Sequence, residues 1–205
     1  MSRPYTLVDT PYSMGCLGLI ALQTDETLEN ELRQVFVDPR TALYVSRVPS
    51  AQTLTPESIA QMGKDLPQAT ALLPPLPAYD AVAYGCTSGT TLIGPQEVQR
   101  LVAAECATAH VTNPLSAAIA ALQALGVGRI GLVSPYTPDI AQPVEDAFVA
   151  AGFSVARALT FGEAQEAHVA RIAPNSLAQA AHEVAGDGVG CAGWCRTKTP
   201  PLPHL

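Results

Sequence analysis

The chain has 205 residues and a mass of 21.4 kDa, which is enough for one large domain or two small lobes with a hydrophobic core. Hydrophobic residues make up 48% of it and charged residues 14%, which excludes a disordered chain. The net charge of −7 argues against nucleic acid as a partner. The sequence has neither a long apolar run nor a signal-peptide pattern, so we expect a soluble, cytoplasmic protein with no membrane contact.

The first half of the sequence alternates strand and helix patterns. Apolar or β-branched runs predict strands at residues 16–22, 41–48 and 81–84. A helix is expected after the first strand, with Thr24 or Asp25 as its cap. A second helix is expected from Thr55, because a proline follows this capping residue. The order strand, helix, strand, helix, strand favours parallel strands with right-handed crossovers.

The second half repeats this alternation. Strands are predicted at residues 109–112 and 129–134 and from 153 to 156, and a further one leads into Cys191. The helices predicted after Cys86 are residues 95–107, which close the first lobe, and residues 115–125, 144–151 and 174–185. We therefore expect an α/β fold of two lobes, each a parallel β-sheet flanked by helices. Residues 1–108 would carry Cys86, and residues 109–205 would carry Cys191.

The five cysteines are an odd number in a chain too large to need disulfide bonds for stability, so free thiols are expected. Three residues separate Cys191 from Cys195, whereas zinc and redox pairs have two. We therefore expect no metal site.

Cys86 stands where a predicted strand ends in a turn rich in hydroxyl groups. Such turns bind ligands in open α/β sheets. The four hydroxyl residues that follow are Thr87, Ser88, Thr90 and Thr91. Gly85 and Gly89 would let the backbone approach a ligand closely. This turn suits a carboxylate or an oxyanion, although a cysteine after a strand is also commonly a small buried hydrophobic residue.

Three further residues lie where ligands could bind, and two of them have a second interpretation. Asp25 follows the first strand and either caps the next helix or contacts a substrate. Arg47, near the end of the second strand, either holds a carboxylate or forms a surface salt bridge. Tyr136 lies in a second turn with hydroxyl groups, after the strand at 129–134, where ligands also bind.

Two thiols on two lobes have a specific chemical use. One thiolate can remove a proton from the carbon beside a carboxylate while a thiol returns a proton to the other face. Alternatively, a thiolate can add to an activated double bond and permit rotation about it. Cys86 and Cys191 are the candidates for this pair.

Several short motifs, spread over most of the chain, resemble the aspartate/glutamate racemase superfamily. The resemblance is stronger to its branch with maleate cis-trans isomerase and arylmalonate decarboxylase. The motifs are Thr24-Asp-Glu-Thr-Leu-Glu29, Ser46-Arg47-Val48, Gly85-Cys-Thr-Ser-Gly89, Ser116-Ala117 with Leu125-Gly126, and Ser134-Pro-Tyr136. The resemblance implies two pseudo-symmetric α/β lobes, a site between them, no cofactor, and a small carboxylate or dicarboxylate substrate. Family precedent and the alanine-rich helices favour a homo-oligomer.

The resemblance also implies roles for individual residues. Cys86 matches the nucleophile or base of the first lobe, and Thr87 and Ser88 match donors to a carboxylate. Tyr136 matches a tyrosine that binds the same carboxylate, and Asp25 falls near a substrate-binding asparagine of the family. The decarboxylases have glycine at the position of Cys86, which favours an isomerase or racemase.

The second cysteine departs from the family pattern. The family reads Ser-Cys-Thr-Asn-Leu-Arg-Thr after its last strand, whereas residues 190–197 form a segment one residue longer. Cys191 is preferred over Cys195 because it is expected to follow the strand directly. Residues 198–205 do not resemble the family, so the second lobe is expected to be shortened at its C-terminus.

The sequence is also compatible with three other functions. An arylmalonate decarboxylase-like enzyme and a non-catalytic carboxylate-binding protein would use the same pocket. A cysteine hydrolase would need a histidine beside Cys86, but none of the four shares a motif with it. We expect those histidines to be structural or solvated; they are His110, His168, His182 and His204.

Overall fold

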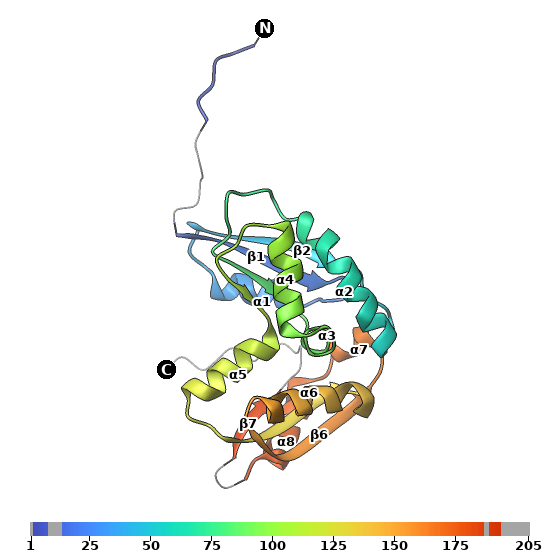
Figure 1. Cartoon of the computed structure of the whole chain (residues 1–205). Helices are drawn as coiled ribbons and strands as arrows, with labels where there is room; N and C mark the ends of the chain where they lie inside the picture. The colour runs from blue at the N-terminus through green and yellow to red at the C-terminus, as the bar shows by residue number, and fades with distance from the viewer. Residues whose placement is uncertain (1, 8–13, 187–188, 194–205) are drawn as a thin grey trace.

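The computed structural model describes residues 2–7, 14–186 and 189–193, which form two separate parallel sheets (Figure 1). The first sheet has the strand order β2-β1-β3-β4, and the second has the order β6-β5-β7. The strands of the first sheet are β1 (Gly15–Leu22), β2 (Thr41–Val48), β3 (Ala81–Tyr84) and β4 (Val111–Thr112). Those of the second are β5 (Arg129–Tyr136), β6 (Ser154–Glu163) and β7 (Gly190–Gly193). All strand pairs are parallel, so the carboxyl ends within each sheet share one edge.

Helices connect the strands, and several begin with a proline. The helices of the first lobe are α1 (Leu28–Val35), α2 (Pro56–Ala71), α3 (Thr87–Ile93) and α4 (Pro95–Glu105). Those that follow are α5 (Pro114–Ala124), α6 (Pro138–Ala150), α7 (Glu166–Val169) and α8 (Pro174–Val184). Proline is tolerated in the first turn because the N–H that it lacks has no partner there. Thr55 and Asn113 cap α2 and α5 by accepting hydrogen bonds from Ser58 and Ser116 N–H groups.

The central strands explain the stability of the two sheets. Residues 18–22 of β1 are buried, as expected of a strand that has a partner on both sides and helices on both faces. The core of the second lobe gathers around Ile130, Leu132 and Phe148. Each sheet therefore has a core of its own.

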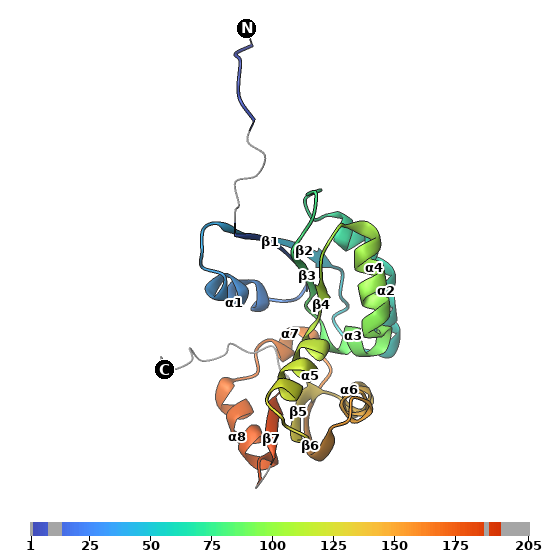
Figure 2. The same cartoon turned by 60° about the vertical axis from the view of Figure 1, so that its left-hand side comes forward.

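The core of the first lobe also includes side chains from the second. Tyr136 at the end of β5, Ile140 of α6 and Val169 of α7 belong to the same buried cluster as Cys86 and Tyr84. Figure 2 shows α3 and α7 between the two sheets. The two lobes are therefore packed against each other where the first sheet ends and α3 begins.

The predicted α/β class with parallel sheets is confirmed, and four element boundaries are corrected. β4 is limited to residues 111–112, and β6 continues to Glu163. α6 begins at Pro138 rather than at residue 144, because the burial of Ile140 stabilises the turn before Pro143. The hydroxyl-rich turn after Cys86 is helix α3. The boundary between lobes at residue 108 stays a prediction, and β4, just beyond it, pairs with the first sheet.

Within the part of the chain that the structure describes, no helix has the length and apolar character needed to cross a membrane.

Candidate functional site

Cys86 lies at the carboxyl end of β3 and caps α3. Its sulfur accepts a hydrogen bond from the Gly89 N–H group at 3.2 Å and shares one with the Ser88 hydroxyl at 3.6 Å. The side chain is almost fully buried, with 1% of its surface exposed. Hydrogen-bond donors that face a sulfur favour the thiolate, the reactive form of cysteine, whereas burial by itself opposes that charge. The expected position of Cys86 after a strand is therefore confirmed.

The four hydroxyl groups after Cys86 divide into two kinds. Thr90 and Thr91 donate hydrogen bonds to carbonyl groups of their own helix, those of Cys86 at 2.6 Å and Thr87 at 3.0 Å. These two hydroxyl groups therefore serve the structure of α3. Thr87 and Ser88 are also buried, and they lie in the first turn beside the sulfur. They remain the candidates for contact with a carboxylate.

The two glycines of the motif make room for protein side chains, and the close approach of a ligand to their backbone stays a prediction. A Cβ atom on Gly85 would lie 2.4 Å from the Leu28 Cδ2 atom. A Cβ atom on Gly89 would lie 2.5 Å from the Tyr84 hydroxyl oxygen and 2.9 Å from the Cys86 sulfur. A larger residue at either position would force these neighbouring side chains to shift, because Cβ contacts under about 3 Å are essentially never observed.

Asp25 has the capping role that the sequence offered as one of two interpretations. Its Oδ1 atom accepts hydrogen bonds from the N–H groups of Thr27 and Leu28, both at 2.8 Å, at the start of α1. The carboxylate is 5% exposed. The contact of Leu28 with Gly85 places this turn beside the start of α3, so a substrate contact by Asp25 stays a prediction.

Arg47 forms the salt bridge that was one of its two interpretations. Its guanidinium contacts the Glu29 carboxylate at 3.1 Å. It also donates hydrogen bonds to the carbonyl groups of Leu22 and Asp25 at 3.0 and 2.8 Å. Arg47 therefore fixes the turn that contains Asp25.

Tyr136 comes from the second lobe and is buried where the two lobes pack together. It ends β5, is 5% exposed and belongs to the buried cluster that contains Cys86. Its carbonyl oxygen accepts a hydrogen bond from the Thr160 hydroxyl, and its N–H group donates to the Ser134 hydroxyl. The backbone of Tyr136 is therefore fixed from both sides.

Cys191 lies inside β7 and does not follow the strand as expected. Its backbone is paired with Gly131 of β5, five positions before Tyr136. Because a strand rises roughly 3.3 Å per residue, Cys191 lies about 16 Å before Tyr136 along the direction of β5. The C-terminal part of β7 extends further than the sequence pattern indicated because Ala192 and Gly193 continue the pairing with β5. Cys195, its alternative, and the C-terminal tail lie outside the described residues.

One residue of the site was missed by the sequence analysis. Tyr84 was treated only as the last residue of a strand, yet its hydroxyl lies against Gly89 beside the Cys86 sulfur. No sequence pattern signals this role, because the proximity of the Tyr84 hydroxyl to Gly89 arises only where β3 turns into α3.

The histidines give no support to a cysteine hydrolase. His110, His168 and His182 are exposed, whereas Cys86 is buried. The His168 ring contacts Glu163 at 3.2 Å. His204 lies outside the described residues.

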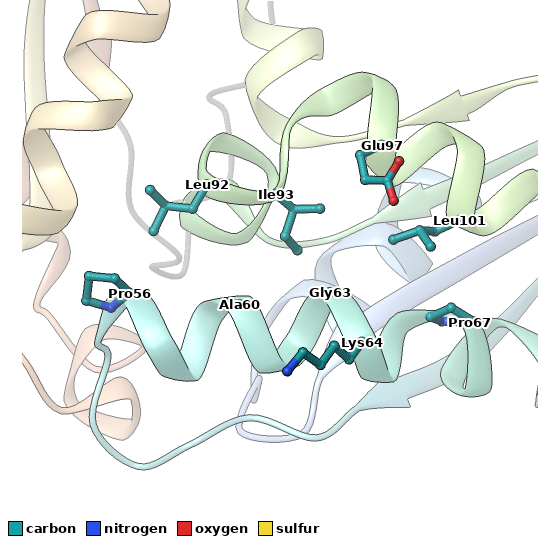
Figure 3. Close-up of a pocket in the computed structure, with 9 residues that line it drawn as sticks. All are labelled: Pro56, Ala60, Gly63, Lys64, Pro67, Leu92, Ile93, Glu97 and Leu101. Carbon is teal, nitrogen blue, oxygen red and sulfur yellow. The ribbon is translucent and has the colours of Figure 1, made fainter.

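A separate groove of about 600 Å³ lies between α2 and the segment from the end of α3 into α4 (Figure 3). Leu92 and Ile93 from α3 face Ala60 and Gly63 of α2 across it. None of the expected site residues lines it. The groove therefore lies at the opposite end of α3 from Cys86.

Comparison with solved structures identifies the fold. A cysteine-to-serine mutant of the maleate cis-trans isomerase of Nocardia farcinica, with a covalently bound succinylcysteine intermediate, matches with a TM-score of 0.75 and 21% identity. The match covers 92% of this chain and 81% of that one. The maleate isomerase of Pseudomonas putida S16 with maleate matches with a TM-score of 0.66 and 22% identity, over 80% of this chain and 70% of that one.

A mutant of arylmalonate decarboxylase in the liganded form also has this fold. It matches with a TM-score of 0.70 and 17% identity, over 89% of this chain and 78% of that one. No protein-family model matches the sequence, and no curated protein matches it. The resemblance expected from the sequence motifs is therefore confirmed at the level of the fold.

Proposed function

We propose that this protein is a cofactor-independent isomerase or racemase of a small carboxylic acid, with Cys86 as the reacting thiol. The observation that carries the proposal is the Cys86 sulfur at the carboxyl end of β3, with a backbone N–H group donating to it at 3.2 Å. The fold shared with maleate isomerases supports it, since one of those structures contains a succinylated cysteine. Cysteine thiolates are strong nucleophiles, and hydrogen-bond donors directed at the sulfur favour this charged form.

For an unsaturated dicarboxylate, the proposed reaction is reversible addition. The Cys86 thiolate forms a C–S bond to one carbon of the double bond, and the electron pair of that bond moves to the other carbon, beside a carboxylate. A second thiol protonates this carbanion, which leaves a single C–C bond that can rotate. The second group then removes the proton, the C–S bond breaks, the double bond re-forms, and the Cys86 thiolate is regenerated.

For a saturated acid, the same two groups would invert a carbon centre. One thiolate removes the proton beside the carboxylate, and a thiol on the other face delivers a proton. Donors at the carboxylate stabilise the enolate that forms between the two steps. Cys191 or Cys195 supplies the second thiol in this proposal.

The carboxylate is proposed to bind at the start of α3. Thr87 and Ser88 are buried in the first helical turn beside the sulfur, and Tyr136 approaches from the second lobe. The turn of Asp25 borders the same place through the contact of Leu28 with Gly85. Hydroxyl groups can donate to a carboxylate without adding a charge, which suits an acidic protein.

Two alternatives use the same pocket. A decarboxylase is disfavoured by the thiol at position 86, where the sequence resemblance places a glycine in the decarboxylases. A non-catalytic carboxylate-binding protein is the outcome if the second thiol is not correctly placed.

The test is turnover by the purified protein with maleate, aspartate, glutamate and an arylmalonate, followed by NMR in D₂O. We expect isomerisation of an unsaturated acid or deuterium exchange beside a carboxylate, with loss of about a thousandfold or more in Cys86→Ser because the nucleophile is removed. Cys106→Ser is the matched control, since its thiol donates a hydrogen bond to the Val102 carbonyl of α4 at 3.6 Å. Equal turnover in wild type and Cys86→Ser would refute the proposal, and binding without turnover would favour the non-catalytic alternative.

A further inference from the structure

The side chain of Tyr84 shares a small space with the Cys86 sulfur. Tyr84 is the last residue of β3 and Cys86 is the cap of α3, and the Cys86 N–H group donates to the Tyr84 carbonyl at 3.0 Å in the turn between them. A Cβ atom on Gly89 would lie 2.5 Å from the Tyr84 hydroxyl oxygen, 3.2 Å from its ring carbon Cε1 and 2.9 Å from the sulfur. The hydroxyl and the sulfur therefore both lie beside Gly89.

Gly89 is the reason that both groups fit. Any other residue at this position would place a carbon atom in contact with the hydroxyl and the sulfur at once. Its own N–H group meanwhile donates to the sulfur at 3.2 Å. Gly89 thus leaves space for the Tyr84 hydroxyl and the sulfur, and its N–H group donates a hydrogen bond to the same sulfur.

Burial makes the proximity electrostatically important. Tyr84 has 0% of its surface exposed and Cys86 has 1%. Water is largely excluded from such a place, so a dipole beside a charged sulfur is weakly screened. A phenol hydroxyl rotates about its C–O bond and can direct its hydrogen toward a neighbouring acceptor.

We propose that Tyr84 is a positioning residue for Cys86, whose hydroxyl donates a hydrogen bond to the sulfur when the thiolate forms. The phenol keeps its proton, so no bond to hydrogen breaks and the tyrosine stays neutral. The sulfur would then have two donors, the Tyr84 hydroxyl and the Gly89 N–H group. The inference deepens the proposed function, on which it rests for the role of the thiolate.

The test is the pH dependence of Cys86 alkylation by iodoacetamide in the full chain, with peptide mass spectrometry to separate Cys86 from the other four cysteines. Tyr84→Phe removes the hydroxyl and keeps the ring. Because a hydrogen bond to a charged group is lost, we expect the alkylation midpoint to move about one pH unit higher. At neutral pH the rate would fall roughly tenfold if the midpoint lies above that pH.

The matched control is Tyr79→Phe. Tyr79 is also buried in the first lobe, but its hydroxyl donates to the Pro74 carbonyl at 2.6 Å. This variant also loses one tyrosine hydroxyl bond, so a merely structural effect would appear in it too. We expect its Cys86 midpoint to equal that of the wild type. An unchanged midpoint in Tyr84→Phe, or equal shifts in both variants, would overturn the inference.

A second measurement covers the case in which Tyr84→Phe does not fold. Fluorotyrosine at position 84 preserves the shape and donates more strongly, so the midpoint should move to lower pH; no movement overturns the inference. Both measurements read the thiol without substrate. If the wild type turns over substrate but the pH profile of Cys86 alkylation does not shift in the Tyr84 variants, only the role of Tyr84 is contradicted. If that profile shifts but the wild type shows no turnover, only the proposed reaction is contradicted.

Discussion

Arg171 and Glu26 join the two lobes by an ion pair with two contacts, although 145 residues separate them in sequence. The Arg171 Nη2 atom lies 2.7 Å from Glu26 Oε1, and its Nε atom lies 3.3 Å from Oε2. Glu26 is the residue after Asp25, and Arg171 follows α7. The ion pair therefore links the turn at the end of β1 to the second lobe.

A second link lies on the other side of α7. The backbone of residues 164–166 pairs with that of residues 52–54: Leu54 N–H donates to the Ala164 carbonyl and Glu166 N–H to the Gln52 carbonyl, both at 3.0 Å. Val169 lies between the two links and packs into the core that contains Cys86. The segment around α7 is thus fastened to the first lobe at both ends.

Glu26→Gln is predicted to loosen this segment with little effect on global stability. Both partners are largely exposed, and exposed ion pairs contribute little to the free energy of unfolding. We expect faster hydrogen exchange at the amides of Leu54 and Glu166, because the neighbouring link opens more often.

Glu97→Gln is the control for this prediction. The pair of Glu97 and Arg100 is also exposed and has the same 2.7 Å contact, but it lies within α4. It should leave both amides unchanged. If both variants changed hydrogen exchange at the Leu54 and Glu166 amides equally, the position of the Arg171–Glu26 pair between the lobes would not explain the effect.

The link should also weaken in acid. The hydrogen bond from Arg171 lowers the pKa of Glu26 from its ordinary value and raises that of Arg171. A carboxyl whose folded pKa is lowered contributes above its unfolded pKa and loses that contribution as the pH falls through the folded value. The exchange difference between wild type and Glu26→Gln should therefore be full at neutral pH and vanish below the range of an ordinary carboxyl group. A difference that persists in strong acid would contradict the assignment to this pair.

Gly85→Ala is predicted to destabilise the first lobe by about 1–3 kcal/mol, because its Cβ atom would clash with Leu28 and displace the entry to α1. Urea unfolding measures this change. Gly128→Ala is the control, since a Cβ atom there has no neighbour within 4 Å. It should be neutral within about 0.5 kcal/mol, as expected for a substitution without special contacts. Equal free energies of unfolding for the two variants would contradict the role of the Leu28 contact.

The two C-terminal cysteines can be separated by substitution. Because Cys191 is paired with Gly131, well before the end of β5 at Tyr136, we expect Cys191→Ser to keep most of the turnover. Cys195→Ser, four residues later in the sequence, is expected to lose it. Deuterium incorporation at the carbon beside the carboxylate measures the missing proton transfer. Loss of turnover in Cys191→Ser alone would restore Cys191 as the second thiol.

Sequence patterns alone were sufficient for the local features of the fold. The strands at 16–22, 41–48 and 81–84 follow from continuous apolar runs, and the start of α2 follows from Thr55 and Pro56. The position of Cys86 after a strand was predicted in the same way. These features depend on periodicity and on hydrogen bonds between residues a few positions apart, so the chain encodes them locally.

Tertiary packing decided the rest. The sequence could not show that Gly89 makes room for the Tyr84 hydroxyl, that Tyr136 joins the buried cluster of Cys86, or that Arg171 pairs with Glu26. The last two contacts join residues far apart in the chain and exist only because the two lobes pack against each other. Their formation depends on the three-dimensional fit of side chains, which no short pattern in the sequence records.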